Sequence, residues 1–259
     1  MELGEDEAMK NTRSYKYTRL YLTVPLSQGT VIELDKEQSH YLANVMRQKL
    51  GASLLVFNGK DGEWLAEISD LQKRSVSLKV KSQTKPQTPE PDLWLAFAPI
   101  KKARLDFIAQ KATELGVSHL IPTMTNRTIV DRVKSERLDA NAAEASEQSE
   151  RLTVPTIADP IKLSKLLDDW PEDRMIMFCD EDLSGKPAII ALQETLPDHA
   201  GKPWALLIGP EGGFDDNERD RIQKHPNTVT VSLGPRVLRA DTAALAAISL
   251  WQAVLGDWS

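Results

Sequence analysis

The sequence predicts an α/β fold with a parallel sheet covered by helices, preceded by a small β-barrel-like domain. Three observations carry this prediction. Before residue 82, apolar residues alternate with a period of two, which favours strands. After residue 92, short apolar runs alternate with stretches of helical periodicity, which is typical of a parallel sheet with helices on both faces. Between them, residues 82–92 contain three prolines among polar residues and are typical of a stiff linker.

These patterns divide the 259 residues into four segments. We expect a disordered acidic leader over residues 1–17, a β domain over 18–85, a linker over 86–92 and an α/β domain over 93–259. A chain of this length accommodates one large domain or two modest ones.

The β domain is predicted to contain five strands and one helix. The strands are expected over residues 19–24, 30–34, 54–57, 63–68 and 75–80. Residues 58–62 read Asn-Gly-Lys-Asp-Gly, a hairpin-turn signal between the third and fourth strands. The helix is expected over residues 39–47, with Leu42, Val45 and Met46 on one side.

The α/β domain is predicted to alternate strands and helices. The strands are expected over residues 93–98, 119–124, 175–179, 204–209 and 228–233. The helices are expected over residues 105–115, 135–151 and 187–196, from residue 215 onward, and over 241–255. Asp215, Asp216 and Glu218 gather at one helix start, where the helix dipole favours negative charge.

Two of these strands run into glycine-rich turns. Residues 209–214 read Gly-Pro-Glu-Gly-Gly-Phe, and Leu233 is followed by Gly234 and Pro235. Glycine exposes backbone N–H and C=O groups, so a flat polar ligand can lie against the main chain. One such loop alone is also a plain strand-to-helix turn. Two of them at the same end of neighbouring strands predict a cofactor cleft, because ligands of open α/β sheets bind beyond the carboxyl ends of the strands.

Charged residues beside the second loop are the candidates for chemistry. Arg236 and Arg239 either hold a helix terminus or surface carboxylate, or present a rigid fork of donors to an oxyanion or phosphate. Asp241 either caps the last helix or takes part in catalysis.

Basic residues elsewhere allow two interpretations. Residues 18–85 carry ten Lys and Arg against seven Asp and Glu, within a chain of net charge −6. This excess either grips phosphates or is chance. Lys101, Lys102 and Arg104 open a helix, as a solvated basic face or as a phosphate contact.

Several function classes have no support in the sequence. Cys179 is the only cysteine, which excludes an internal disulfide and fits a reducing, cytoplasmic setting. No apolar run is long enough to cross a bilayer, and the acidic start is unlike a signal peptide. The four histidines lack metal-ligand spacing, so we infer no metal site. No phosphate-loop or nucleophile-elbow motif is present.

Several blocks of sequence, in order, carry a resemblance to a known family. The blocks are residues 19–22; His40, Tyr41, Leu42, Val45 and Arg47; residues 110–117; residues 144–151 with Pro155; residues 208–214; and residues 233–239 followed by Thr242 and Ala243. Together they resemble the 16S ribosomal RNA uridine-N3 methyltransferases, S-adenosylmethionine-dependent enzymes of the knotted SPOUT superfamily. The resemblance covers nearly everything after the leader.

The resemblance implies a PUA-like β-barrel that helps to hold RNA, followed by a SPOUT-type catalytic domain with a deep trefoil knot. It implies a homodimer that acts on 16S ribosomal RNA or the small ribosomal subunit. It places S-adenosyl-L-methionine against Ile208, Gly209, Pro210, Glu211, Gly212, Gly213, Leu233, Gly234, Val237, Leu238 and Arg239. The residues expected to contact RNA are Arg19, Arg47, Lys101, Lys102, Arg104 and Arg151. Many relatives are expected to have Thr-Glu where this chain has Ala240 and Asp241, which shortens the acid by one carbon.

The implied reaction moves a methyl group from a sulfonium to N3 of uracil. N3 becomes nucleophilic only as its proton leaves, and the negative charge spreads onto O2 and O4. We expect Arg236 to meet this charge, and Asp241, Glu211 or water to accept the proton. The target uridine must be unpaired or extruded. Two alternatives stay open: another SPOUT methyltransferase acting on a ribose hydroxyl or a tRNA base, and a non-catalytic RNA-binding ribosome-assembly protein.

Overall fold

The chain folds into two compact units in the computed structural model, which describes residues 17–72, 75–130, 132–182 and 185–258. The first unit consists of the residues up to Thr88 together with Ser146–Thr153, and the second of Pro89–Ala145 and Val154–Ser259. The sequence did not predict that a segment so distant joins the first unit. The leader predicted to be disordered lies outside the described residues, apart from Tyr17. The domain boundaries at residues 85 and 93 stay predictions.

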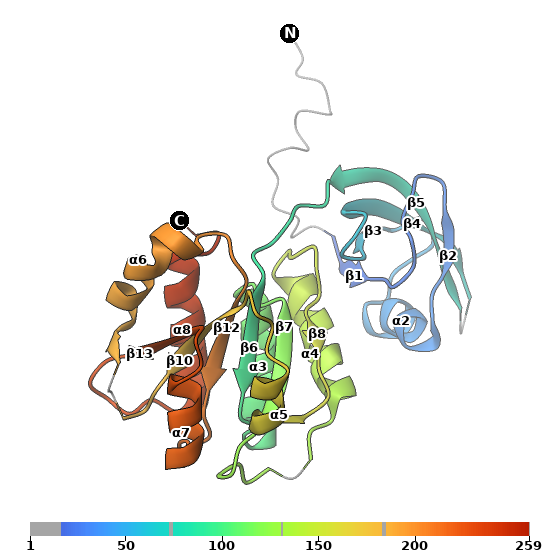
Figure 1. The fold of residues 1–259 in the computed structure, drawn as a ribbon. Coiled ribbons are helices and arrows are strands. Elements are labelled where there is room, and N and C mark those ends of the chain that lie inside the picture. Colours follow the sequence, from blue (N-terminus) through green and yellow to red (C-terminus); the bar gives the residue numbers. More distant parts are fainter. Residues whose placement is uncertain (1–16, 73–74, 131, 183–184, 259) are drawn as a thin grey trace. The chain divides into compact units, whose positions relative to one another are not determined.

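Five strands form the sheet of the first unit, in the order β1-β3-β4-β5-β2. Their bounds are β1 Arg19–Tyr21, β2 Val31–Glu33, β3 Ser53–Phe57, β4 Glu63–Leu71 and β5 Val76–Lys85. Neighbours are antiparallel except β1 and β3, and the sheet curls on itself (Figure 1). The five predicted strands are confirmed, although β1 ends at Tyr21 rather than at residue 24. β5 extends past its predicted end at Val80 because residues 81–85 pair with β4 without burying a side chain.

The helix of this unit differs from its prediction. It begins earlier, as α2 (Lys36–His40), because Asp35 caps it by accepting a hydrogen bond from the Gln38 backbone N–H at 2.8 Å. It continues as a π-helical turn, η2 (Tyr41–Val45). The wider turn changes which side chains share a face. Leu42 is buried, whereas Val45 is 58% exposed, so the predicted common apolar side is wrong.

Arg19 is buried inside the first unit and holds the distant segment. Its Nε donates to Glu63 Oε2 at 2.8 Å. Its Nη1 donates to the carbonyl oxygens of Ser146 and Glu147 at 2.7 and 3.0 Å, and its Nη2 to that of Arg151 at 2.9 Å. A charge can be buried when it is paired and hydrogen-bonded in this way. The prediction that Arg19 contacts RNA is therefore wrong, because its donors are committed within the protein.

The second unit is built on a parallel sheet in the order β11-β13-β10-β12-β6-β7-β8, with β9 pairing β7. The bounds are β6 Leu93–Phe97, β7 His119–Met124, β8 Thr156–Ile157, β9 Ile161–Lys162, β10 Met175–Cys179, β11 Lys186–Pro187, β12 Trp204–Ile208 and β13 Thr228–Ser232. Every pairing is parallel, as the alternation of strands and helices predicted.

Helices cover both faces of this sheet (Figure 1). Their bounds are α3 Lys102–Glu114, α4 Ser135–Gln148, α5 Leu163–Asp168, α6 Ala188–His199, α7 Asp216–Gln223 and α8 Ala240–Val254. Alternate residues of each central strand face opposite sides. In β10, Met177 packs with α3, α6 and α8, whereas Phe178 packs with α5 and α7. This two-sided burial is the reason that the strands read as continuous apolar runs.

The predicted helices are confirmed, and their ends shift for local reasons. α4 stops at Gln148 rather than residue 151, and Glu150 adopts a left-handed φ of 60° that no helix accommodates. α5 escaped prediction because it is a single short apolar run of six residues. No helix in the described part of the chain is long and apolar enough to span a bilayer.

Candidate functional site

The carboxyl ends of three parallel strands converge at the site. β10 lies between β12 and β13, and Cys179 at its end pairs with Ile208 of β12 and Val231 of β13. The two glycine loops therefore follow strands that flank β10, and the prediction that they follow neighbouring strands is wrong. Both loops still reach the same edge, because all three strands run in the same direction. The turn after β10 lies between them.

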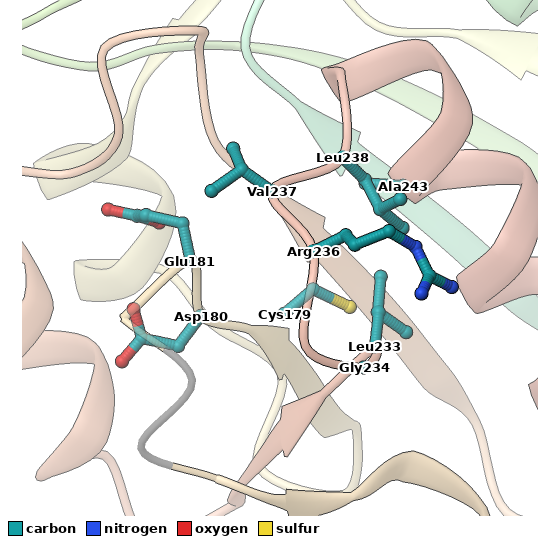
Figure 2. A pocket seen from close by; sticks show the side chains of 9 residues that line it. All are labelled: Cys179, Asp180, Glu181, Leu233, Gly234, Arg236, Val237, Leu238 and Ala243. Carbon is teal, nitrogen blue, oxygen red and sulfur yellow. The ribbon is translucent and has the colours of Figure 1, made fainter.

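The two loops and that turn line a cavity of about 470 Å³. A second cavity of about 50 Å³ shares Cys179, Glu181, Val237, Leu238 and Ala243 with it (Figure 2). Ten of the predicted cofactor residues line one cavity or the other. Those that line the larger cavity are Ile208, Gly209, Pro210, Glu211, Gly212, Gly213, Val237 and Leu238. Leu233 and Gly234 line the smaller cavity. Arg239 lines neither.

Gly213 gives the first loop its shape. Its φ is 67°, and a Cβ atom built there would lie 2.1 Å from Glu181 Oε1. The next backbone N–H, that of Phe214, donates to the same oxygen at 3.0 Å. The Phe214 ring is buried and packs edge-on against Phe178, with 5.3 Å between ring centroids. Glu181 and Phe214 together fix this loop against β10.

Arg219 of α7 binds the acidic turn after β10. Its Nε donates to buried Asp180 at 3.1 Å, and its Nη2 to Glu181 Oε1 at 2.5 Å. Its Nη1 lies 3.0 Å from Asp182. Burial would lower the pKa of Arg219, but these carboxylates raise it above its ordinary value. Sequence reasoning missed this cluster, although three consecutive acids after a predicted strand are a visible signal.

The second loop presents an apolar tip beside a free guanidinium. Gly234 adopts a φ of 109°, which favours glycine, and Val237 is 86% exposed. Arg236 is exposed, and Figure 2 shows its side chain running away from the carboxylates of Asp180 and Glu181. Those two acids therefore leave the positive charge of Arg236 unneutralised.

Asp241 does not cap the last helix, contrary to one of its two predicted roles. α8 begins at Ala240, so Arg239 occupies the N-cap position and Asp241 lies within the first turn. There the helix dipole stabilises its negative charge. Asp241 Oδ2 lies 3.8 Å from Arg104 Nε of α3, and Asp241 lines neither cavity.

The other predicted RNA contacts occupy varied surroundings. Arg47 is exposed with a left-handed φ of 50°. Lys101 is exposed at the start of α3, and Arg104 is half-buried beside Asp241. Arg151 is half-buried and donates from Nε to Thr153 Oγ1 at 3.0 Å. The side chain of the sixth residue, Lys102, lies outside the described part.

Comparison with known proteins decides the family. An RNA methyltransferase domain model matches residues 87–252, and an RNA methyltransferase PUA domain model matches residues 34–81. A ribosomal RNA small subunit methyltransferase E from Rickettsia conorii is 35% identical over 235 residues, covering 90% of this chain and 94% of that protein. The chain belongs to this methyltransferase family.

Two solved structures agree with that membership. A crystal structure of ribosomal RNA small subunit methyltransferase E from Neisseria gonorrhoeae, bound to S-adenosyl methionine, matches with a TM-score of 0.82 at 28% identity. It covers 94% of this chain and 100% of its own. A putative methyltransferase from Legionella pneumophila in complex with S-adenosyl methionine also reaches 0.82, at 29% identity, covering 93% and 99%.

The family and the structure together confirm the predicted fold class. This RNA methyltransferase has a SPOUT-type α/β domain with a parallel sheet, preceded by a small PUA-like barrel. The passage of the chain through a trefoil knot stays a prediction, since strand order does not describe threading.

Cys179 lines both cavities of this methyltransferase. Burial raises the pKa of its thiol to about 12, so the thiol is almost entirely protonated at neutral and mildly basic pH. We expect a disulfide reagent at pH 8 to modify Cys179 about 1,000-fold more slowly in the native protein than in urea, because only the thiolate reacts. Stopped-flow absorbance measures both rates, and a native rate near that of the unfolded chain would contradict the burial.

Proposed function

We propose that this protein transfers the methyl group of S-adenosyl-L-methionine to N3 of a specific uridine in 16S ribosomal RNA. The observation that carries the proposal is the cavity between two glycine loops at the carboxyl edge of the sheet, in a chain of this family. The names of the relatives support the small-subunit RNA. The resemblance of the sequence blocks supports N3 of uridine.

The residues of the cavity fit this methyl donor. A volume of about 470 Å³ lies within the range of small-molecule sites. Ile208 and Leu238 offer apolar surface to a flat ring, and Glu211 places negative charge near the donor's positive groups. We assign the donor to the ten predicted residues that line the two cavities. When bound, it supplies a methyl group on a positively charged sulfur.

Arg236 is the proposed stabiliser of the reacting base. As the N3 proton leaves, negative charge develops on uracil O2 and O4. An exposed guanidinium on the cavity wall can donate to these oxygens and bind the transition state more tightly than the ground state. The carboxylates of Asp180 and Glu181 lie on the other side of Arg236 and do not compete for it (Figure 2).

We choose between the candidate proton acceptors by asking which carboxylate lines a cavity. Glu211 lines the larger cavity and is exposed, so its carboxylate can accept the N3 proton directly or through water. Asp241 lies beside Arg104 at the start of α8 and outside both cavities. We therefore propose Glu211 as the acceptor and keep Asp241 as a residue that acts only if substrate reaches α8.

The wider setting follows from the resemblance. We propose that Arg47, Lys101, Lys102, Arg104 and Arg151 contact RNA and that the protein is cytoplasmic. We also propose a homodimer. The exposed Ile189 and Ile190 of α6, at 47% and 49%, show that the second unit presents apolar surface.

A methyl-transfer assay tests the function. Purified protein is incubated with S-adenosylmethionine carrying a labelled methyl group and either 16S ribosomal RNA or small subunits. We expect label in the RNA, and mass spectrometry of its nucleosides to identify it as 3-methyluridine. Label on a ribose hydroxyl, or label in tRNA supplied in a parallel reaction, would favour the first alternative. Donor binding without any transfer would favour a non-catalytic assembly protein.

A further inference from the structure

Charge is partitioned along the carboxyl edge of the sheet. Across the sheet the strands follow the order β13, β10, β12, β6, β7. The loops after β10 and β12 are acidic, with Asp180, Glu181, Asp182, Glu211 and Asp215. The segments after β6 and β7 are basic: residues 101–104, at the start of α3, hold three cations and no anion, and residues 125–134 hold three cations and one anion. Because β6 and β7 are neighbours, the two basic segments follow adjacent strand ends.

Asn126 and Arg127, which follow β7, are hydrogen-bonded to the start of α7 and to the first glycine loop. The Asn126 backbone N–H donates to Glu218 Oε1 at 2.8 Å, and its Nδ2 donates to Asp215 Oδ2 at 2.6 Å. Arg127 Nη1 donates to the Gly212 carbonyl oxygen at 2.9 Å, and Arg127 lines the larger cavity. The exposed Arg127 side chain is thereby held at the mouth of the site.

The two carboxylates that bind Asn126 also accept hydrogen bonds at the start of α7. Asp215 and Glu218 form the capping box of α7, and each also accepts a hydrogen bond from Asn126. The hydrogen bond from the Glu218 backbone N–H, helped by that from Asn126, lowers the pKa of Asp215. The positive charge of Arg127 adds to this lowering. These carboxylates serve the start of α7, and the Arg127 side chain is itself exposed.

We infer that Arg127, Arg132 and Lys134 bind the phosphate backbone of the RNA substrate, with Arg127 contacting a phosphate at the edge of the larger cavity. The inference rests on the proposed function. Arg132 and Lys134 of the same segment are exposed and line neither cavity, so their charge acts outside the donor site. The sequence segments that follow β6 and β7 hold six cations against one anion, which favours an anionic polymer at this end of the sheet. The methyl donor, which is cationic at its sulfur, is favoured by the acidic loops after β10 and β12.

Salt-dependent binding of full-length protein to a 16S ribosomal RNA transcript, without donor, tests the inference. Arg127→Ala should weaken binding about tenfold and reduce the log–log salt slope by about 0.7 to 0.9, the value for one phosphate. Arg127→Lys should keep the slope, since it keeps the charge. Arg132→Ala, at a residue that lines neither cavity, should reduce the slope by a similar amount.

Arg221→Ala is the matched control. It removes one positive charge from α7 where Arg221 pairs with Asp168 of α5, outside both cavities. Its slope should equal that of the native protein. Equal slopes for native protein, Arg127→Ala and Arg132→Ala would overturn the inference, as would an equal loss in Arg221→Ala. So would weaker donor binding by Arg127→Ala, measured by calorimetry, with an unchanged RNA slope.

The outcome is separable from that of the proposed function. If the native protein transfers no methyl group but the slopes differ as expected, the function fails and the phosphate contact stands. If transfer to 16S ribosomal RNA occurs and the slopes do not differ, the function stands and the contact fails.

Discussion

Replacing Arg236 with alanine is expected to lower kcat for methyl transfer by about 100- to 1,000-fold, the usual effect of removing one donor to a developing oxyanion. The charge on uracil O2 and O4 exists only as the N3 proton leaves, so the loss belongs to the transition state. KM for RNA should change little. Because Arg236 is exposed on the second loop, its removal should leave the folded structure intact. Single-turnover kinetics with labelled donor measure the effect.

Two further variants sharpen this experiment. Arg236→Lys keeps the charge but loses the fork of donors, so its kcat should lie between those of the native protein and Arg236→Ala. Arg221→Ala, which removes a charge outside both cavities, should retain native kcat. Equal losses of donor affinity and kcat in Arg236→Ala would move Arg236 from catalysis to donor binding.

The sequence predicted the central strands well for a physical reason. The predicted bounds of β7 and β10 match the structure, because strands buried on both faces are apolar runs with polar ends. It also located both glycine loops, since the positive φ values of Gly213 and Gly234 require that residue type. Local chemistry determines these features, so they are visible in one sequence.

Features that depend on distant contacts escaped prediction. Nothing in the apolar run of residues 175–179 shows that it lies between the strands of the glycine loops, and so the acidic turn at Asp180 was missed. Arg19 looks like a surface cation in a basic domain, but its hydrogen bonds to Ser146–Thr153 bury it. Arg127 gains its place at the cavity from the Gly212 carbonyl, a contact between residues 85 positions apart.

Gly213 and Gly212 are adjacent in the first glycine loop, but alanine at the two positions is expected to have different effects on donor affinity and stability. Gly213→Ala is expected to lower donor affinity at least tenfold, the equivalent of about 1.4 kcal/mol, and to lower the free energy of unfolding by about 1 to 3 kcal/mol. An alanine at φ 67° is strained, and its Cβ would lie 2.1 Å from Glu181 Oε1. Relief of that clash requires Glu181 to leave the Phe214 N–H, which releases the loop from β10.

Gly212→Ala supplies the control from the adjacent position. The φ of Gly212 lies outside the left-handed region, and a Cβ there would meet Arg127 Cβ at 3.6 Å, an ordinary contact. Unfolding in urea should therefore stay close to the native value, and donor affinity by calorimetry should fall less than in Gly213→Ala. If both variants bind the donor alike, the loop does not depend on the Gly213 conformation. A Gly213→Ala variant that loses stability but binds the donor with native affinity would show that the first glycine loop, as Glu181 holds it, is not the donor site. A loop released from Glu181 is not expected to bind the donor as tightly as one held in place.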